Sequence, residues 1–352
     1  MRALLLYLLR LTLLLSLLTS CEHRPLQDFV NAHYIRVYVD ENIRNVTFGF
    51  YNEQYDRPEH ERPRVIRVVL ADPVSGTIIS ERYLQNQGVD SMGYYLDGYI
   101  GAPAGRYNML LYNFGSPRTL IGNEQNYFAM QGYTEQVSDY YLQYLPAVRQ
   151  TIDERQIVQQ PDHLFHAVQE DIIINKNEIV DTLLDDNGSY FKAHSMVKSY
   201  YIQIKVKGIE WAISAVSLLS GMAGSSLIHQ HEGMIESDSV HVLLTLTPTE
   251  RKRSGPDGNT TATLYTTFNT FGKLPDIPSH LTITFEFTKR DGSSQIEEID
   301  ITDMFDTPLV RDQQWILLDH EIELTPPEGS PIDGGLTPGV DEWTDIESEI
   351  II

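Results

Sequence analysis

The chain has little cysteine, few basic residues for its length, and none of the short motifs that mark common enzymes. Its 352 residues include one cysteine, so no disulfide can form within the chain. Lys and Arg number 26 against 49 Asp and Glu, a net charge of −23, and a surface that acidic repels phosphate backbones. These shortages exclude a disulfide-stapled scaffold and predict that nucleic acid is not a partner.

Motifs for catalysis and metal binding are also missing. No Gly-x-Ser-x-Gly elbow occurs, and Gly221–Ser225 lacks the lysine of a P-loop, so we interpret it as a turn. His163 and His166 are spaced to point to opposite faces of a strand, whereas His229 and His231 lie in a turn-like region with too few further ligands. Acidic pairs are too common here to identify a glycosidase. We expect no metal, no cofactor and no catalytic residue.

The N-terminus has the composition of a secretory signal. Met1-Arg2 supplies a short basic start, and Ala3–Leu18 is almost wholly apolar. This run is shorter than the ~20 apolar residues of a membrane span, and Arg10 in its middle would cost a few kcal/mol there. We therefore predict that residues 1–20 are a removed signal peptide.

The end of this segment resembles the bacterial lipobox. Leu18 is followed by two small residues, Thr19 and Ser20, and then by Cys21, the only cysteine. In such a motif the thiol takes a diacylglyceryl group, and the freed amino group is then acylated, for example with palmitate. Two or three acyl chains hold a protein on a membrane stably, and one does not. The sequence predicts a lipoprotein of the outer membrane at the cell surface; the alternative is a chance cysteine beside a removed signal.

The rest of the chain has the periodicity of an all-β protein. We predict a tether at 21–32, a β-sandwich at 33–160, a second β-sandwich at 161–324, and a linker with a terminal strand at 325–352. Val137–Val148 is the best helix candidate. The cleanest alternation is Leu281–Thr288, in which three apolar side chains point inward and Glu286 outward. The strands expected in the two units are His33–Val39, Val46–Tyr51, Val65–Leu70, Thr77–Tyr83, Tyr94–Ile100 and Tyr107–Tyr112, then Leu164–Val168, Asp171–Ile174, Val197–Lys207, Ile209–Ala223, Val240–Thr247, Ala262–Phe268, Leu281–Thr288 and Gln295–Ile301.

The C-terminal tail is a candidate for strand exchange. A Pro- and Gly-rich linker from Thr325 to Gly339 leads to a segment with one apolar face and one acidic face. Such a strand can fold back on its own sheet or add to the sheet of another subunit, and the sequence leaves both alternatives open. The residues that would make the contact are Val340, Ile346, Ile350 and Ile352.

Tyrosine is unusually common, and many of the 20 tyrosines fall in the first unit. Aromatic rings with a polar tip suit sugar platforms and protein interfaces, but they are also ordinary strand residues. The tyrosines in question are Tyr94, Tyr95, Tyr99, Tyr107, Tyr112, Tyr127, Tyr133, Tyr140, Tyr141 and Tyr144.

With its lipobox, two β-rich units and terminal strand, the chain resembles the fimbrillin superfamily of Gram-negative anaerobes, in particular its lipidated anchor or minor subunits. The likeness rests on Tyr34–Asp40, His163–Ala167 and Val197–Val206, and on the segments Gly208–Trp211 and Leu218–Gly224 that follow. It implies two tandem transthyretin-like sandwiches, no catalytic residues, and other fimbrial subunits as partners joined by β-strand addition.

The resemblance also implies a difference between subunit types. Shaft subunits of this superfamily lose an N-terminal strand to an arginine-specific protease, whereas an anchor should keep its lipid and that strand. Cleavage after Arg44 or in the arginine-rich loop Arg57–Arg67 would favour a polymerising role. A surface lipoprotein that binds a glycan or a host protein through a Tyr-rich face is the alternative, and a hydrolase is a third hypothesis without nameable catalytic groups.

Overall fold

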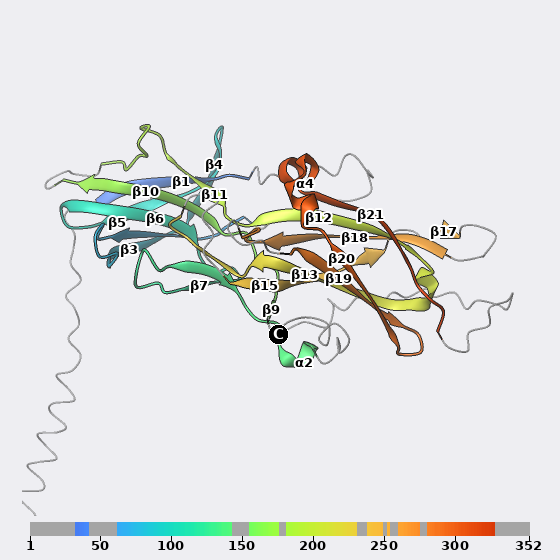
Figure 1. Cartoon of the computed structure of the whole chain (residues 1–352). Coiled ribbons are helices and arrows are strands. Elements are labelled where there is room, and N and C mark those ends of the chain that lie inside the picture. The colour runs from blue at the N-terminus through green and yellow to red at the C-terminus, as the bar shows by residue number, and fades with distance from the viewer. Residues whose placement is uncertain are drawn as a thin grey trace, which may run out of the picture.

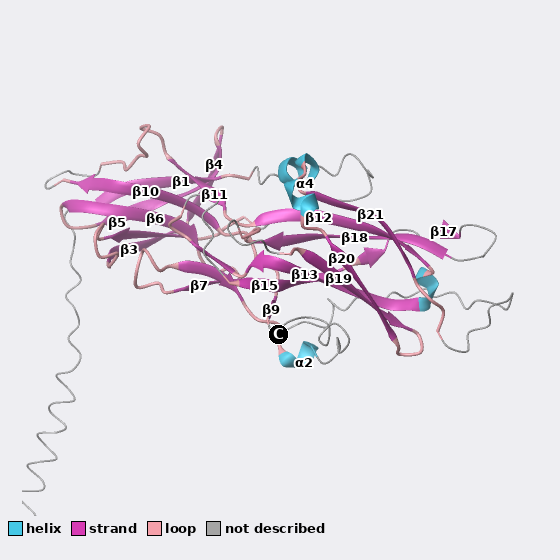
Figure 2. Cartoon of the chain, viewed as in Figure 1, coloured by secondary structure: helices cyan, strands magenta, loops and turns pink. Residues whose placement is uncertain are grey.

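The regular structure of the chain is nearly all β (Figures 1 and 2). The computed structural model describes residues 32–41, 62–142, 155–175, 181–230, 238–248, 252–253, 260–274 and 280–327. The helices among them are short: α2 (Asp139–Leu142), α4 (Pro308–Gln313) and two 3₁₀ turns, Ile209–Trp211 and Asp303–Asp306. The predicted all-β class is confirmed. None of the helices in these ranges is long and apolar enough to cross a membrane.

One eight-stranded sheet builds the N-terminal half, on the left in Figure 1. Its ends face each other as two layers, because Ile35 and Leu96 share a buried cluster with Val68 and Leu111 from the other end of the sheet. The strands, in spatial order, are β3 (Ile78–Leu84), β2 (Ile66–Ala71), β6 (Gly105–Asn113), β10 (Phe165–Ile174), β11 (Phe191–Ser195), β1 (Ala32–Val39), β5 (Gly93–Gly101) and β4 (Asn86–Asp90).

Two five-stranded sheets build the C-terminal half and enclose the largest buried cluster, which includes Ile204, Leu264 and Phe285. One sheet contains β16 (Thr247–Pro248), β18 (Thr260–Thr270), β12 (Lys198–Lys207) and β21 (Trp315–Glu323), with β17 (Lys252–Arg253) paired to β18. The other runs β20 (Ser294–Asp300), β19 (Thr282–Lys289), β13 (Ala212–Ala223), β15 (Ser239–Thr245) and β9 (Ile157–Val158).

A third buried cluster joins the two halves. Val69 and Tyr112 contribute to it from the outer face of the N-terminal sheet, and Val197 and Phe271 from the C-terminal half. A small sheet of β7 (Thr119–Gly122), β8 (Gln131–Thr134) and β14 (Ser225–Leu227) lies at this junction, since β14 follows β13 directly and pairs with β8. The halves therefore share both core and hydrogen bonds.

The predicted boundary between residues 160 and 161 does not coincide with the division of the sheets. β9 pairs with β15 in the C-terminal half, whereas β10 pairs with β6 and β11 pairs with β1 in the N-terminal half. The chain thus enters the C-terminal half, returns, and enters it again at β12. Alternation along a strand tells which side chains face a core, but it does not tell which strand lies alongside.

Three local predictions also need correction. The two strands expected at Leu164–Val168 and Asp171–Ile174 are one strand, β10, with a bulge at which Asp171 takes a φ of 57°. Glu286, expected outside, is 1% exposed and accepts a hydrogen bond from Ser294, because β19 is covered on both faces. Gly221 lies inside β13, where the pairing with β15 shifts register, so the glycine-rich segment begins with a bulge and not a turn.

Two further predicted elements, a helix and a strand, lie partly or wholly outside the described residues. Of the helix expected at Val137–Val148, α2 accounts for four residues, and residues 143–150 lie outside the described ranges. The strand expected at Val46–Tyr51 also lies outside them. The division into two tandem transthyretin-like sandwiches stays a prediction.

Candidate functional site

The residues predicted for lipidation and for strand exchange lie outside the described residues. These are Leu18, Thr19, Ser20 and Cys21 at one end and Val340, Ile346, Ile350 and Ile352 at the other. Their roles stay predictions. The structure does place the segment on which the difference between subunit types depends, the N-terminal strand β1.

β1 lies in the interior of the N-terminal sheet. It pairs antiparallel with β5 along most of its length and parallel with β11 near its end. Ile35 and Val37 are 0% exposed and Val39 is 5% exposed, all within the buried cluster of this half. Loss of β1 would therefore separate β5 from β11 and open an apolar groove between them.

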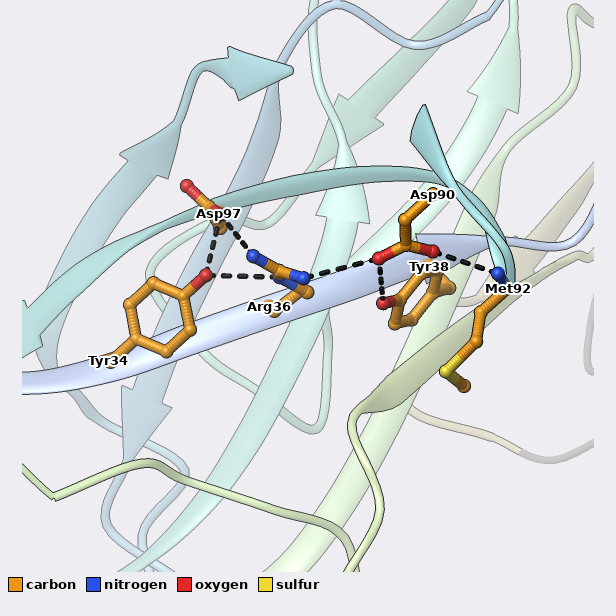
Figure 3. A network of polar contacts seen from close by, with 6 residues as sticks. All are labelled: Tyr34, Arg36, Tyr38, Asp90, Met92 and Asp97. Atoms are coloured by element: carbon orange, nitrogen blue, oxygen red, sulfur yellow. Dashed lines mark hydrogen bonds and ion pairs between the residues drawn. The ribbon is translucent and has the colours of Figure 1, made fainter. Parts of the chain in front are cut away.

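The outer face of β1 carries a polar network centred on Arg36 (Figure 3). The Arg36 guanidinium donates hydrogen bonds to the Tyr34 hydroxyl at 3.0 Å, to Asp90 at 3.3 Å and to Asp97 at 3.2 Å. Tyr34 donates to Asp97 at 2.6 Å, and Tyr38 donates to Asp90 at 2.7 Å. Since Asp97 is on β5 and Asp90 ends β4, the network ties three adjacent strands together from the outside.

Tyrosine rings enclose the same guanidinium. Arg36 lies 3.9 Å from the centre of the Tyr95 ring and 5.4 Å from that of Tyr190, which precedes β11. A cation that close to a ring face is attracted by its quadrupole. The Tyr38 ring packs edge-on against Tyr95 at 5.6 Å. The side chains on the outer face of β1 thus contact residues of β5 on one side and Tyr190, just before β11, on the other.

The network shifts the pKa values of its members. Burial, reinforced by the hydrogen bond to Asp97, raises the pKa of Tyr34 to about 12. The hydrogen bond from Tyr38 lowers the pKa of Asp90, with the Met92 amide assisting. The tyrosines stay neutral and Asp90 stays ionised over the whole neutral range, which is the state that these hydrogen bonds require.

The predicted arginine-rich loop is partly inside the fold. Arg62 forms an ion pair with Glu41, two residues beyond the end of β1, and lies 5.0 Å from the Tyr94 ring. The Tyr94 hydroxyl donates to the backbone oxygen of Pro63 at 2.8 Å. Arg67, expected in the loop, lies in β2 and is 5% exposed, so a protease could not reach it in the folded protein.

The tyrosines considered for a binding face do not share one face. Tyr94, Tyr107, Tyr112 and Tyr127 are buried in the cores, and Tyr99 on β5 is 55% exposed. The side chains of Tyr140, Tyr141 and Tyr144 lie outside what the structure describes. The candidate face is therefore smaller than the sequence suggested.

Two of the histidines considered as ligands have identified partners. His163 contacts the Ser195 hydroxyl at 2.9 Å, and His166 contacts the Ile228 carbonyl oxygen at 2.7 Å. Among the described residues, no three His, Cys, Asp or Glu side chains come together as metal ligands. His231 lies outside them.

Asp90 and Asp97 are the members of the Arg36 network that sequence reasoning missed. Both belong to the hairpin of β4 and β5, which brings them over β1 from more than fifty residues away. The alternation of Tyr34, Arg36 and Tyr38 did place these three on one face. No sequence feature identified their acidic partners, because the chain has 49 acidic residues of similar appearance.

Comparison with known proteins gives a family and several relatives. The sequence model of the family described as "Domain of unknown function (DUF5119)" matches residues 68–244, half of the chain. A Bacteroides ovatus protein named "Putative fimbrium anchoring subunit Fim4B" is 22% identical over an alignment 357 residues long. The alignment covers 94% of this chain and 92% of that protein.

Solved structures were also compared, and one of them has a TM-score above 0.5. A "putative adhesin" of Bacteroides ovatus is 19% identical, with a TM-score of 0.56 over 88% of this chain and 98% of that chain. The fimbrial anchor protein Mfa2 of Porphyromonas gingivalis is 14% identical, with a TM-score of 0.42 over 81% of this chain and 88% of that chain. The resemblance to fimbrial anchor proteins, stated above from the sequence, is confirmed by the Bacteroides ovatus relative named as a fimbrium anchoring subunit.

Proposed function

The chain belongs to the family described as "Domain of unknown function (DUF5119)", and we propose that it is a non-enzymatic surface lipoprotein that acts as an anchor or minor structural subunit of fimbriae. The observation that carries this proposal is the end-to-end similarity to the protein named as a fimbrium anchoring subunit, which covers more than nine-tenths of both chains. A fimbrial structural or adhesive role also fits the adhesin structure that shares the fold.

The lipid anchor is the first part of the proposal. Acylation of Cys21 would tether the acidic body to the outer membrane through residues 22–31, which precede β1. Two or three acyl chains suffice for a stable anchor. Other fimbrial subunits would be the partners on the far side, joined by strand addition that uses Val340–Ile352.

Retention of β1 is the second part. The buried side chains on its inner face and the Arg36 network on its outer face both depend on β1 remaining in the sheet. The network raises the cost of removing the strand, because its contacts to Asp97 on β5, Asp90 on β4 and the Tyr190 ring would be lost with it. The geometry therefore supports an anchor, which keeps its first strand, over a shaft subunit, which loses it.

Two measurements on the protein from its native membrane test the proposal. Mass analysis of the extracted protein should find an acylated N-terminal Cys21 continuous with residues 32–41, and Cys21→Ala should abolish labelling with a fatty-acid analogue and release the protein from the membrane. A mature chain that begins after Arg44 or within Arg57–Arg67 contradicts the anchor role. Equal labelling of wild type and Cys21→Ala contradicts the lipid anchor.

A further inference from the structure

A hollow of about 370 Å³ lies on the N-terminal half, away from the Arg36 network. It opens between the edge strand β3 and the loop that follows β7, and its lining includes Glu81 and Arg82 from β3 and Glu124 and Gln125 from the loop. The volume is at the small end of the ~300–1,000 Å³ range of ligand sites.

The hollow is built around a buried arginine. Arg67 on β2 is 5% exposed, and its guanidinium donates to the Tyr112 hydroxyl at 2.7 Å and to the carboxylates of Glu81 and Glu124. The two carboxylates come from different elements, β3 and the loop after β7, and Arg67 holds them together. An ion pair in this partly buried setting holds its geometry better than a surface pair does.

The loop on the far side is also held in place. The Tyr127 amide donates to the Gly76 carbonyl oxygen at 2.8 Å, and the Asn126 side chain donates to the Ser75 carbonyl oxygen at 3.2 Å. Asn123 adopts a φ of 56°, a conformation that Asn tolerates better than most residues do. The loop is thereby attached to the turn between β2 and β3, and the hollow is preformed.

Two exposed aromatic rings lie next to the same arginine, beside the hollow and outside its lining. Tyr83, at the end of β3, is 43% exposed, and Phe114, after β6, is 41% exposed. Their ring centres are 5.5 Å apart, and they lie 5.9 and 6.0 Å from the Arg67 guanidinium carbon. Tyr83 and Glu81 are two apart on β3, so their side chains lie on the same face of the strand.

The charges of the hollow cancel. Arg67 and Arg82 offset Glu81 and Glu124, so the site favours neither a free cation nor a free anion. Each carboxylate has about four lone-pair positions and uses only part of them on Arg67. Glu81 and Glu124 keep 46% and 34% of their side-chain surface exposed, so they can accept further hydrogen bonds from a ligand.

We propose that this hollow binds a neutral saccharide. A sugar ring has an apolar face that packs on Tyr83 and Phe114, and hydroxyl groups that donate to Glu81 and Glu124 and accept from Arg82 and Gln125. Saccharide binding would give the protein a ligand of its own in addition to a role in fimbria assembly, and it does not depend on that role.

The test is a titration of the mature chain carrying Cys21→Ala with five neutral tetrasaccharides: cellotetraose, maltotetraose, mannotetraose, xylotetraose and chitotetraose. Calorimetry and saturation-transfer NMR should show saturable binding of at least one of them. Glu81→Gln and Tyr83→Ala should each weaken that binding about tenfold, the loss expected for one hydrogen bond to a charged acceptor or one stacked ring. Tyr83 is 43% exposed, so Tyr83→Ala should melt within a few degrees of the parent. In Glu81→Gln the amide oxygen still accepts from Arg67 and Glu124 remains its carboxylate partner, and the Tm of this variant is measured beside its binding.

Tyr99→Ala is the matched control. Tyr99 is an exposed tyrosine on β5, 55% exposed, and its ring packs against Tyr34, whereas the Tyr83 ring lies beside Arg67. This variant should bind the saccharide as the parent does. Three results would each overturn the proposal. The first is no saturable binding of any of the five tetrasaccharides, and the second is an equal loss of affinity in Tyr99→Ala and Tyr83→Ala. The third is that the protein binds tetra-arginine and none of the saccharides, and that Glu81→Gln abolishes the binding of tetra-arginine.

Discussion

Replacement of Ile35 by alanine should strongly destabilise the protein, because Ile35 fixes β1 in the N-terminal core. The side chain is 0% exposed within the buried cluster that joins the two layers. It lies opposite Gly98 on β5, which has no side chain that could move into the space left behind. Ile35→Ala is therefore a truncation that the surrounding structure cannot easily repair.

The magnitude follows from the atoms removed. Three buried carbons at about 0.8 kcal/mol each account for about 2.4 kcal/mol of lost transfer free energy. The unfilled cavity adds to this, which brings the expected loss to about 3–4 kcal/mol, inside the range of about 2–5 kcal/mol found for such truncations. With an unfolding entropy of about 2.1 cal/mol/K per residue, a mature chain of about 330 residues should lose about 4–6 °C in Tm.

Calorimetry and denaturant unfolding of the mature chain measure this loss. Val89→Ala is the control, because Val89 is 66% exposed on the hairpin of β4 and β5 and its truncation should change stability by no more than about 0.5 kcal/mol. If Ile35→Ala lowers the free energy of unfolding by less than about 1 kcal/mol, β1 does not contribute to the stability of the sheet. The argument for its retention would then fail.

Three further predictions concern the network and the tail. Arg36→Ala should lower the free energy of unfolding by about 1–3 kcal/mol, because Asp90 and Asp97 lose their charge-assisted partner, and Arg36→Lys should recover only part of this loss. Equal stability of the wild type and both variants would rule out a structural network. The pKa of Tyr34 is raised to about 12 in the folded protein, so this tyrosine ionises at lower pH in the unfolded chain than in the folded one. Stability should therefore fall as the pH rises from 10 towards 12, and less steeply in Tyr34→Phe. The same dependence of stability on pH in the wild type and in Tyr34→Phe would refute this. Deletion of residues 340–352 should abolish co-purification with a fimbrial partner and leave the Tm of the monomer nearly unchanged if the tail is a subunit contact; a strongly lowered Tm would show that it closes the protein's own sheet.

The sequence predicted strands and their inward faces well, because alternation follows directly from the geometry of a strand. In Leu281–Thr288, Ile283, Phe285 and Phe287 are all 0% exposed, as expected. The burial of Glu286 on the opposite face could not be predicted, since periodicity shows the polar face but not whether another part of the chain covers it.

Strand partners were harder to predict than strands. β10 pairs with β6, more than fifty residues earlier, and β1 pairs with β11, more than 150 residues later. Such pairings depend on long-range packing for which a single sequence gives no local signal. The same limit applies to the Arg36 network, in which Tyr34 and Tyr38 were placed on one face but their partners Asp90 and Asp97 were not identified.

The two ends of the described chain differ in a way that bears on assembly. β1 has a strand on each side, whereas β20 and β21 each pair on one side only within the described residues. The chain leaves the C-terminal half beside both edges: Leu324 donates to the Lys207 carbonyl oxygen at 2.9 Å, and the Thr325 amide donates to the Gln295 side chain at 3.1 Å.

From that point, the fifteen residues 325–339 could extend up to roughly 50 Å, at about 3.3–3.6 Å per residue. The linker is therefore long enough for the terminal strand to pair either with the protein's own sheet or with the sheet of a partner. A lone strand is not stable in water, so a strand formed by the tail would have to pair with one of them. The edge strands β20 and β21 and the edges of another subunit would then compete for it. Loss of assembly on deletion of the tail fits either outcome, so the stability of the shortened monomer is the measurement that separates them.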